Sequence, residues 1–156
     1  MEEKLQHDNG NSKVSILIVD DHSIVRRGLI QLINQEPDLR VCGEAENAAQ
    51  ALEIIKRQQV DVAIVDISLH GINGIQLTEK IKSIRPNLPV LILTMHEEVV
   101  YAKRALHAGV EGYVTKSEAA EKIVTAIRQV LSGKEYISKT MVDNSLRKLR
   151  AEGPYF

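Results

Sequence analysis

Short apolar runs alternate along the chain with longer segments in which apolar residues recur every three or four positions. The runs are rich in Val and Ile, as is typical of strands that are buried on both faces of a parallel sheet. We expect five such strands, at Val14–Val19, Leu39–Glu44, Val60–Val65, Pro89–Leu93 and Gly112–Thr115.

A helix is predicted after each strand, because the apolar spacing there changes from continuous to helical. The expected helices run from Ser23 to the turn before Pro37, and over Ala48–Ile55, Ile75–Ile84, Val99–Leu106 and Ala119–Leu131. Since parallel strands need crossover connections, five strand–helix units imply an α/β fold with helices on both faces of the sheet.

The two ends of the chain depart from this pattern. Residues 1–12 are polar and mixed in charge, and we expect a disordered tail there, followed by one domain at residues 13–134. Residues 135–156 are expected to form a linker and a short tail helix, because Val142, Leu146 and Leu149 share one helical face. The basic residues of that helix are expected to keep its outer face in water, with nucleic-acid contact as the alternative.

Composition narrows the classes of function. Lys and Arg number 20 against 21 Asp and Glu, so the net charge of -1 gives no general attraction for nucleic acid or an anionic membrane. The single cysteine, Cys42, excludes an internal disulfide and is expected to be a small buried hydrophobe in a reducing compartment. No apolar run approaches the roughly 20 residues of a membrane span, and no signal peptide precedes the first strand, so we expect a soluble, cytoplasmic protein without a membrane partner.

Polar residues follow directly on four of the predicted strands, always at the carboxyl end. They are Asp20 and Asp21, Asp66, Thr94 and Lys116. In an open α/β sheet this edge is where ligands bind. If the first, third, fourth and fifth strands are neighbours, these side chains converge on one shallow pocket.

The carboxylates in such a pocket repel one another, and a divalent cation relieves the repulsion. Mg²⁺ prefers hard oxygen ligands and is typically held by one or two carboxylates together with phosphate oxygens. Lys116 would add a second positive charge, and the Thr94 hydroxyl could donate to a phosphoryl oxygen. Taken alone, Asp20 and Asp21 could equally be the N-cap of a helix, but polar residues at the ends of four strands favour a site.

These residues lie in segments that closely resemble the receiver domain of two-component response regulators, from Val14 to about Tyr136. The matching segments are Ile16–His22 with the acidic pair, Val62–Asp66, the loop Gly71–Gly74, Leu91–His96, and Ala108–Lys116. They are most similar to the subfamily with a C-terminal LuxR-type helix-turn-helix. The resemblance implies a flavodoxin-like (βα)5 fold, with five parallel strands in the order 2-1-3-4-5.

The resemblance also implies roles for individual residues. Asp66 would be the phosphoacceptor, with Mg²⁺ held by Asp20, Asp21, Asp66 and the backbone carbonyl of Ser68. Thr94, Tyr113 and Lys116 would contact the phosphoryl group or switch in response to it. Ser68 and His96 would flank that group and tune its hydrolysis.

The implied partner is a sensor histidine kinase, which would phosphorylate Asp66. A homodimer is compatible with an apolar output face at about residues 97–131, and DNA would be reached only through an output domain outside this chain. The resemblance implies a signalling domain and not an enzyme, apart from self-phosphorylation and self-dephosphorylation. Since Phe156 leaves no room for a helix-turn-helix, we expect the receiver part of a transcription factor, or alternatively a receiver that acts alone.

Two histidines, His70 and His22, lie near the predicted site in the sequence. His70 stands where family members commonly have proline, and we expect it to face solvent from its loop. His22 follows the acidic pair and is expected to belong to the start of the helix.

Two other classes of protein fit the residues less well. Metal-dependent phosphohydrolases that form an aspartyl phosphate typically carry Asp-x-Asp after the first strand, whereas here Asp20 and Asp21 are followed by His22 and Ser23. A nucleotide-binding fold would need a glycine-rich phosphate loop, and none follows any predicted strand.

Overall fold

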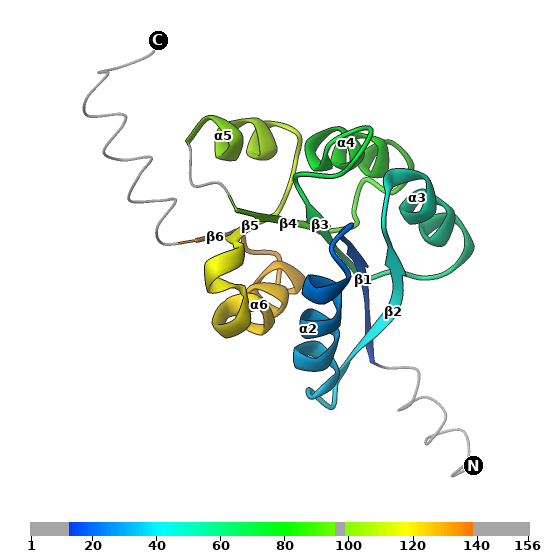
Figure 1. The fold of residues 1–156 in the computed structure, drawn as a ribbon, viewed down its shortest axis with the longest axis vertical. Helices are drawn as coiled ribbons and strands as arrows, with labels where there is room; N and C mark the ends of the chain where they lie inside the picture. Colours follow the sequence, from blue (N-terminus) through cyan, green and yellow to red (C-terminus); the bar gives the residue numbers. More distant parts are fainter. Residues whose placement is uncertain (1–12, 96–98, 139–156) are drawn as a thin grey trace.

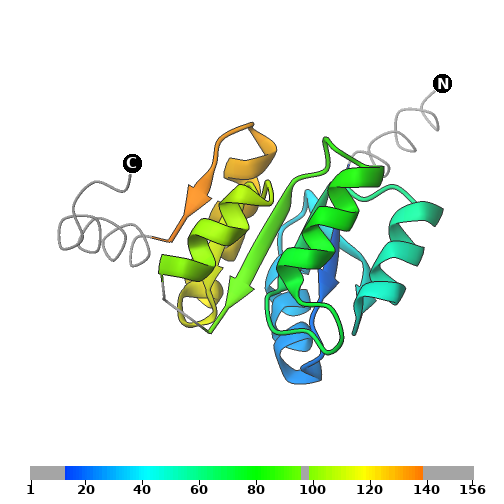
Figure 2. The ribbon, with the colours of Figure 1, turned by 90° about the horizontal axis from the view of Figure 1, so that it is seen from above.

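The computed structural model describes residues 13–95 and 99–138 of the chain. In this part, a six-stranded sheet runs in the order β2-β1-β3-β4-β5-β6, and every strand pairs in parallel with its neighbours. Helices α3, α4 and α5 cover one face of the sheet, and α2 and α6 cover the other (Figures 1 and 2). The predicted α/β class and the strand order 2-1-3-4-5 are therefore confirmed.

The strands lie close to their predicted positions. They are β1 (Val14–Val19), β2 (Leu39–Ala45), β3 (Val62–Asp66), β4 (Val90–Thr94), β5 (Gly112–Thr115) and β6 (Tyr136–Ile137). The expectation of five strands was wrong by one, because β6 pairs with β5 at its outer edge. This strand has only two residues, both partly exposed, so it carries no apolar run that periodicity could detect.

Four helices connect the first five strands, as predicted, and a fifth helix leads from β5 to β6. They are α2 (Ser23–Asn34), α3 (Ala48–Arg57), α4 (Gly74–Ile84), α5 (Val99–His107) and α6 (Lys116–Leu131). The start of α4 is fixed by a capping box, in which Asn73 accepts from the Gln76 backbone N–H and the Gln76 side chain accepts from the Asn73 N–H. Helix α6 begins at Lys116, three residues before its predicted start, so this lysine is held by both β5 and α6.

The hydrophobic core has two layers because side chains alternate across the strands. In β1, for example, Leu17 and Val19 pack under α3, α4 and α5, whereas Ile16 and Ile18 pack under α2 and α6. All four side chains are completely buried, and each such burial contributes about 1.5–3 kcal/mol. The sheet is thereby held rigidly up to the carboxyl ends of its strands, where the polar residues stand.

Cys42 was expected to be buried, but it is only half-buried because β2 is an edge strand of the sheet. This partial burial raises the pKa of its thiol. The predicted N-terminal tail, the tail helix and His96 lie outside the described residues. Within the described part, no helix has the length and apolar character that crossing a membrane requires.

Candidate functional site

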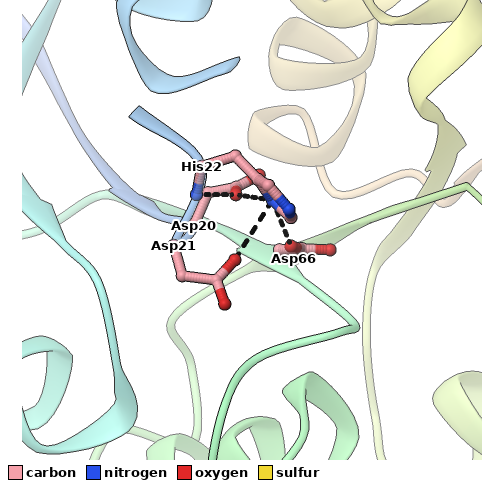
Figure 3. Close-up of side chains that lie close together, drawn as sticks. All are labelled: Asp20, Asp21, His22 and Asp66. Atoms are coloured by element: carbon pink, nitrogen blue, oxygen red, sulfur yellow. Dashed lines mark hydrogen bonds and ion pairs between the residues drawn. The ribbon is translucent and has the colours of Figure 1, made fainter. Parts of the chain in front are cut away.

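The carboxyl edge of the sheet brings Asp20 and Asp66 together. Strands β1 and β3 are neighbours, and Val19 pairs with Val65, so Asp20, which follows β1, lies level with Asp66, the last residue of β3. Both aspartates are almost completely buried, with exposed fractions of 0% and 1%. Asp21 lies beside them with its side chain 12% exposed (Figure 3). The predicted convergence of the three acids is what the structure shows.

Lys116 provides a positive charge inside this cluster. Its Nζ lies 3.1 Å from Oδ2 of Asp20 and 3.3 Å from Oδ2 of Asp66, and its side chain is only 11% exposed. It reaches the acids because β5, which it follows, lies two strands away from β3. The single positive charge of Lys116 is therefore shared by two buried carboxylates, and the cluster keeps an excess of negative charge.

The Asp66 carboxyl reflects these opposing influences. Burial raises its pKa, and the nearby charge of Asp20 raises it further. The Ser68 backbone N–H, which donates to Oδ1 of Asp66 at 3.1 Å, and the Lys116 ammonium lower the pKa, but they do not cancel the effect of burial. A carboxylate held in this way is stabilised by any added positive charge.

Three oxygens of the cluster are suited to a metal ion. Oδ2 of Asp20, Oδ1 of Asp21 and Oδ2 of Asp66 are buried. Within the described part of the chain they face the ion-pair partners Lys116 and His22 but accept no further hydrogen bond. Together with His22, the three acids offer ligand atoms that all lie within 4.8 Å of one another. A hard divalent cation with oxygen ligands fits this donor set.

His22 takes part in the site in a way that the sequence did not predict. It is the N-cap residue of α2, as expected, but its side chain makes no capping hydrogen bond. Instead, its Nδ1 lies 2.9 Å from Oδ1 of Asp20, 3.1 Å from Oδ1 of Asp21 and 3.7 Å from Oδ2 of Asp66 (Figure 3). Its position directly after the acidic pair was the only available signal.

His70 is also tied to the site. Its imidazole is 92% exposed, as predicted for a loop residue, but its Nδ1 lies 2.5 Å from Oδ2 of Asp21. The loop that carries His70 returns to the sheet at Gly74, whose backbone N–H donates to the Ile67 carbonyl at 2.9 Å. A Cβ at Gly74 would overlap the backbone carbonyl oxygen of Asp66, so the close return of this loop requires glycine.

Thr94 and Tyr113 lie on the β4–β5 side of the site. Leu93 pairs with Asp66 in the sheet, so Thr94 stands one residue beyond Asp66 on the adjacent strand. Thr94 is completely buried, and so is Tyr113, which packs in the core layer under α3, α4 and α5. The sequence thus predicted that polar residues from the ends of four strands meet at this edge, but it did not predict the contacts of His22 and His70.

Comparison with known proteins agrees with this geometry. The family model of the response regulator receiver domain matches residues 16–128. The response regulator GacA of Pseudomonas aeruginosa is 35% identical over 125 residues, which are 80% of this chain and 58% of that protein. The response regulator UvrY of Escherichia coli is 32% identical over 146 residues, which are 91% of this chain and 67% of that protein. The chain thus spans only part of the length of these relatives.

Solved structures indicate the subfamily of response regulators to which this chain is similar. A two-component response regulator of the LuxR family from Aurantimonas sp. SI85-9A1 is 34% identical and superposes with a TM-score of 0.84, over 88% of this chain and 98% of that one. The isolated REC domain of RcsB from Salmonella enterica serovar Typhimurium is 27% identical with a TM-score of 0.79, over 85% and 98%. The resemblance to LuxR-type regulators is therefore confirmed, and the chain belongs to the family of response regulator receiver domains.

Proposed function

We propose that Asp66 accepts a phosphoryl group from the phosphohistidine of a sensor histidine kinase, and that the resulting change of shape controls an output. The observation that carries this proposal is the placement of Asp66. Its carboxylate is buried at the ligand-binding edge of the sheet, and its Oδ2 accepts no hydrogen bond while it faces Lys116 at 3.3 Å. This oxygen is the candidate nucleophile.

The chemistry is substitution at phosphorus by a carboxylate. An oxygen of Asp66 forms a bond to phosphorus as the phosphorus–nitrogen bond of the donor breaks, and the electron pair of that bond returns to the imidazole nitrogen. A Mg²⁺ ion held in this pocket would supply positive charge to offset the charge on the phosphoryl oxygens. Asp20, Asp21 and Asp66, with the carbonyl of Ser68, are the residues that would hold the ion.

The other residues respond to the new group. Lys116 is close enough to move from the carboxylates to a phosphoryl oxygen, because its Nζ already contacts Asp66. The hydroxyl of Thr94 would donate to the same group from the adjacent strand. Tyr113 would follow by adjusting its packing beside β4, and Ser68 and His96 would tune how long the phosphoryl group survives.

The C-terminal part of the receiver offers a path for this change. The Ser138 backbone N–H donates to the Tyr113 carbonyl at 2.9 Å, and the Tyr136 N–H donates to the Glu111 carbonyl at 2.9 Å. The Ser138 hydroxyl also donates to the Glu118 carboxylate at 2.7 Å. A shift of β5 or α6 would therefore move the segment that leads beyond residue 138.

The output that we propose is control of transcription. RcsB, a structural relative with 26% identity and a TM-score of 0.81, has been solved as a DNA complex, and that match covers 92% of this chain and 72% of that one. For this protein, DNA would be bound by an output domain outside the chain, and pairing of two receivers would be one way to set its affinity. A cytoplasmic location and the absence of enzymatic turnover beyond the receiver's own phosphoryl group are parts of the same proposal.

The test is phosphorylation by acetyl phosphate with Mg²⁺, followed by intact-mass measurement. The wild-type chain should gain one phosphoryl group, and Asp66→Asn should gain none. Asp61→Asn is the matched control, because Asp61 precedes the same strand and lies at its amino end, away from the site. Oδ2 of Asp61 accepts a hydrogen bond from the Ser15 backbone N–H, and the side-chain oxygen of asparagine can accept the same bond. Equal labelling of Asp66→Asn and wild type would remove Asp66 as the acceptor.

A further inference from the structure

Arg26 is a charged side chain of α2 that is largely withdrawn from solvent. Only 12% of its side chain is exposed, whereas its neighbour Arg27 is an exposed residue. Its Nη1 donates a hydrogen bond to the backbone carbonyl oxygen of Asp20. Because Asp20 is completely buried, this carbonyl needs a donor from the protein itself. Arg26 thus reaches the acidic cluster through the main chain that follows β1.

Two glutamates set the direction of the guanidinium. Its Nε donates to Oε1 of Glu44 at 3.0 Å, and its Nη2 lies 3.9 Å from Oε2 of Glu46. Glu44 pairs with Ile18, whose side chain packs under α2, so the Glu44 side chain lies on the same face of the sheet as that helix. A guanidinium is planar and holds its donors in a fixed fork. The bond to Glu44 therefore aims Nη1 at the carbonyl of Asp20.

The main chain of Asp20 is held from both sides. Its N–H donates to the Ala45 carbonyl at 2.9 Å, and its own carbonyl accepts from Arg26. Because a peptide unit is planar, fixing this carbonyl also fixes the N–H and the Cα of Asp21. The directions in which the Asp20 and Asp21 side chains leave the main chain are thereby set. Those directions decide how the two carboxylates face Asp66.

We propose that Arg26 is a positioning residue for the phosphorylation of Asp66. The inference rests on the proposed function, because it takes Asp66 as the phosphoacceptor. By holding the carbonyl of Asp20, the guanidinium keeps the acidic pair in the orientation that phosphoryl transfer needs. A displacement of about 1 Å at a reacting site can cost about a hundredfold in rate. A residue that holds the acids from behind therefore contributes to the rate without touching the reacting atoms.

Positive charge alone does not serve this purpose. An ammonium group is a compact charge without the fixed fork of a guanidinium, so lysine cannot bind Glu44 and the Asp20 carbonyl in two set directions. Arg26→Lys keeps a cation beside Glu44 and Glu46 and should stay folded, but it should hold Asp20 less firmly. This variant separates the direction of the hydrogen bonds from the charge.

The experiment is phosphorylation of the whole chain by acetyl phosphate with saturating Mg²⁺, with the initial rate followed by intact-mass measurement. Rates are compared at a temperature at which circular dichroism shows the variants to be folded. We expect Arg26→Gln to react roughly tenfold or more slowly than wild type, and the rate of Arg26→Lys to lie between the two. The matched control is Arg27→Gln, because Arg27 is an exposed arginine on the same helix, and it should keep the wild-type rate. If Arg26→Gln does not fold, the rate of Arg26→Lys decides.

NMR spectra test the main-chain contact independently of the rate. Loss of a hydrogen bond at a carbonyl changes the resonance of that carbonyl carbon and of the amide nitrogen that follows it. Both substitutions of Arg26 should therefore shift the carbonyl carbon of Asp20 and the amide nitrogen of Asp21. Arg27→Gln should leave both resonances in place.

Three results would overturn the inference. If Arg26→Gln is phosphorylated at the wild-type rate, the acidic pair does not need Arg26. If Arg26→Lys matches wild type, the charge is sufficient and the fixed fork has no role. If the variants are slow but the Asp20 and Asp21 resonances do not move, the effect does not pass through the main chain of Asp20.

Failure of the proposed function can be recognised separately. If the wild-type chain gains no phosphoryl group, or if Asp66→Asn gains one equally, the receiver function fails and the inference about Arg26 fails with it. If wild type and Arg27→Gln react at the same rate, Asp66→Asn does not react, and Arg26→Gln is as fast as wild type, only the inference about Arg26 fails.

Discussion

The backbone N–H of Ser138 donates a hydrogen bond to the carbonyl oxygen of Tyr113 at 2.9 Å, which joins the end of β6 to the middle of β5. Tyr113 is completely buried, and Ile137, its partner in the parallel register, packs against the same core layer. The residue expected to respond to phosphorylation is thus tied by its main chain to the segment that leaves the receiver. This link would allow a change at the site to be felt beyond residue 138.

Removing that hydrogen bond should loosen β6. Ser138→Pro lacks the donor, and proline keeps the preceding Ile137 in the extended conformation of a strand. We expect a loss of about 1 kcal/mol in the free energy of unfolding, together with faster hydrogen exchange of the Tyr136 amide. Urea unfolding and exchange measured by NMR would check both.

The matched control is Ser138→Ala, which retains the backbone donor and loses only the hydroxyl bond to Glu118. It should leave the Tyr136 amide better protected than Ser138→Pro does. If the two variants exchange equally fast, the main-chain link does not hold β6 in place.

The raised pKa of Asp66 predicts that this carboxylate weakens the fold at neutral pH. A carboxyl whose pKa is higher in the folded than in the unfolded protein binds its proton more tightly when folded. The stability that the protonated form contributes is therefore present below about pH 4 and is lost as the pH rises through the folded pKa. Asp66→Asn removes the charge and should remove this loss.

Thermal unfolding at pH 7 without divalent cations should show the difference. We expect Asp66→Asn to raise the Tm by about 3 °C, the shift that about 1 kcal/mol produces in a domain of this size. The gain should shrink as the pH falls toward 4, where the wild-type carboxyl becomes protonated. A variant that is less stable than wild type at pH 7 would show that Lys116 already compensates Asp66 fully.

The five main strands and their helices were predictable because their signals are local. A strand that is buried on both faces, such as Val62–Asp66, is a continuous apolar run, and its alternation with helical spacing implies the parallel topology. The neighbourhood of Asp20, Asp66 and Lys116 then follows from the strand order. By contrast, β6 is held by hydrogen bonds to β5, and a two-residue strand has no periodicity of its own.

The histidine contacts could not be read from the sequence for a different reason. A residue at the start of a helix is usually explained by that helix, so His22 gave no sign that its ring turns back over the acids. His70 touches Asp21 only because the loop after β3 returns close to the sheet at Gly74. Side-chain direction at such places depends on tertiary contacts and not on local pattern.

Magnesium should stabilise the fold through Asp21. An ion that binds only the folded chain adds about 1.4 kcal/mol of stability when its concentration is ten times its Kd. We expect Mg²⁺ to raise the Tm of the wild type by an amount that corresponds to this free energy, and to raise the Tm of Asp21→Asn much less. Asp21→Asn removes a negative charge from the cluster but keeps the size of the side chain. Thermal scans over a series of Mg²⁺ concentrations would measure both.

Glu53→Gln is the control for this measurement, because Glu53 is an exposed carboxylate on α3 that pairs with Arg57 outside the site. It should respond to Mg²⁺ as wild type does. An Asp21→Asn chain with the full magnesium response would mean that Asp21 does not hold the ion.

Two glycines allow a paired test of how the loop after β3 is built. A Cβ at Gly74 would overlap the backbone carbonyl oxygen of Asp66, and backbone atoms cannot move aside cheaply. Gly74→Ala should therefore destabilise the fold by about 1–3 kcal/mol and slow phosphorylation, because the loop and Asp66 must separate. At Gly28 in α2, a Cβ meets nothing within 4 Å, so Gly28→Ala should stabilise the fold by about 0.5–1 kcal/mol through better helix propensity. Chemical denaturation of both variants checks the opposite signs, and a Gly74→Ala chain as stable as wild type would show that the loop can reach the sheet by another path.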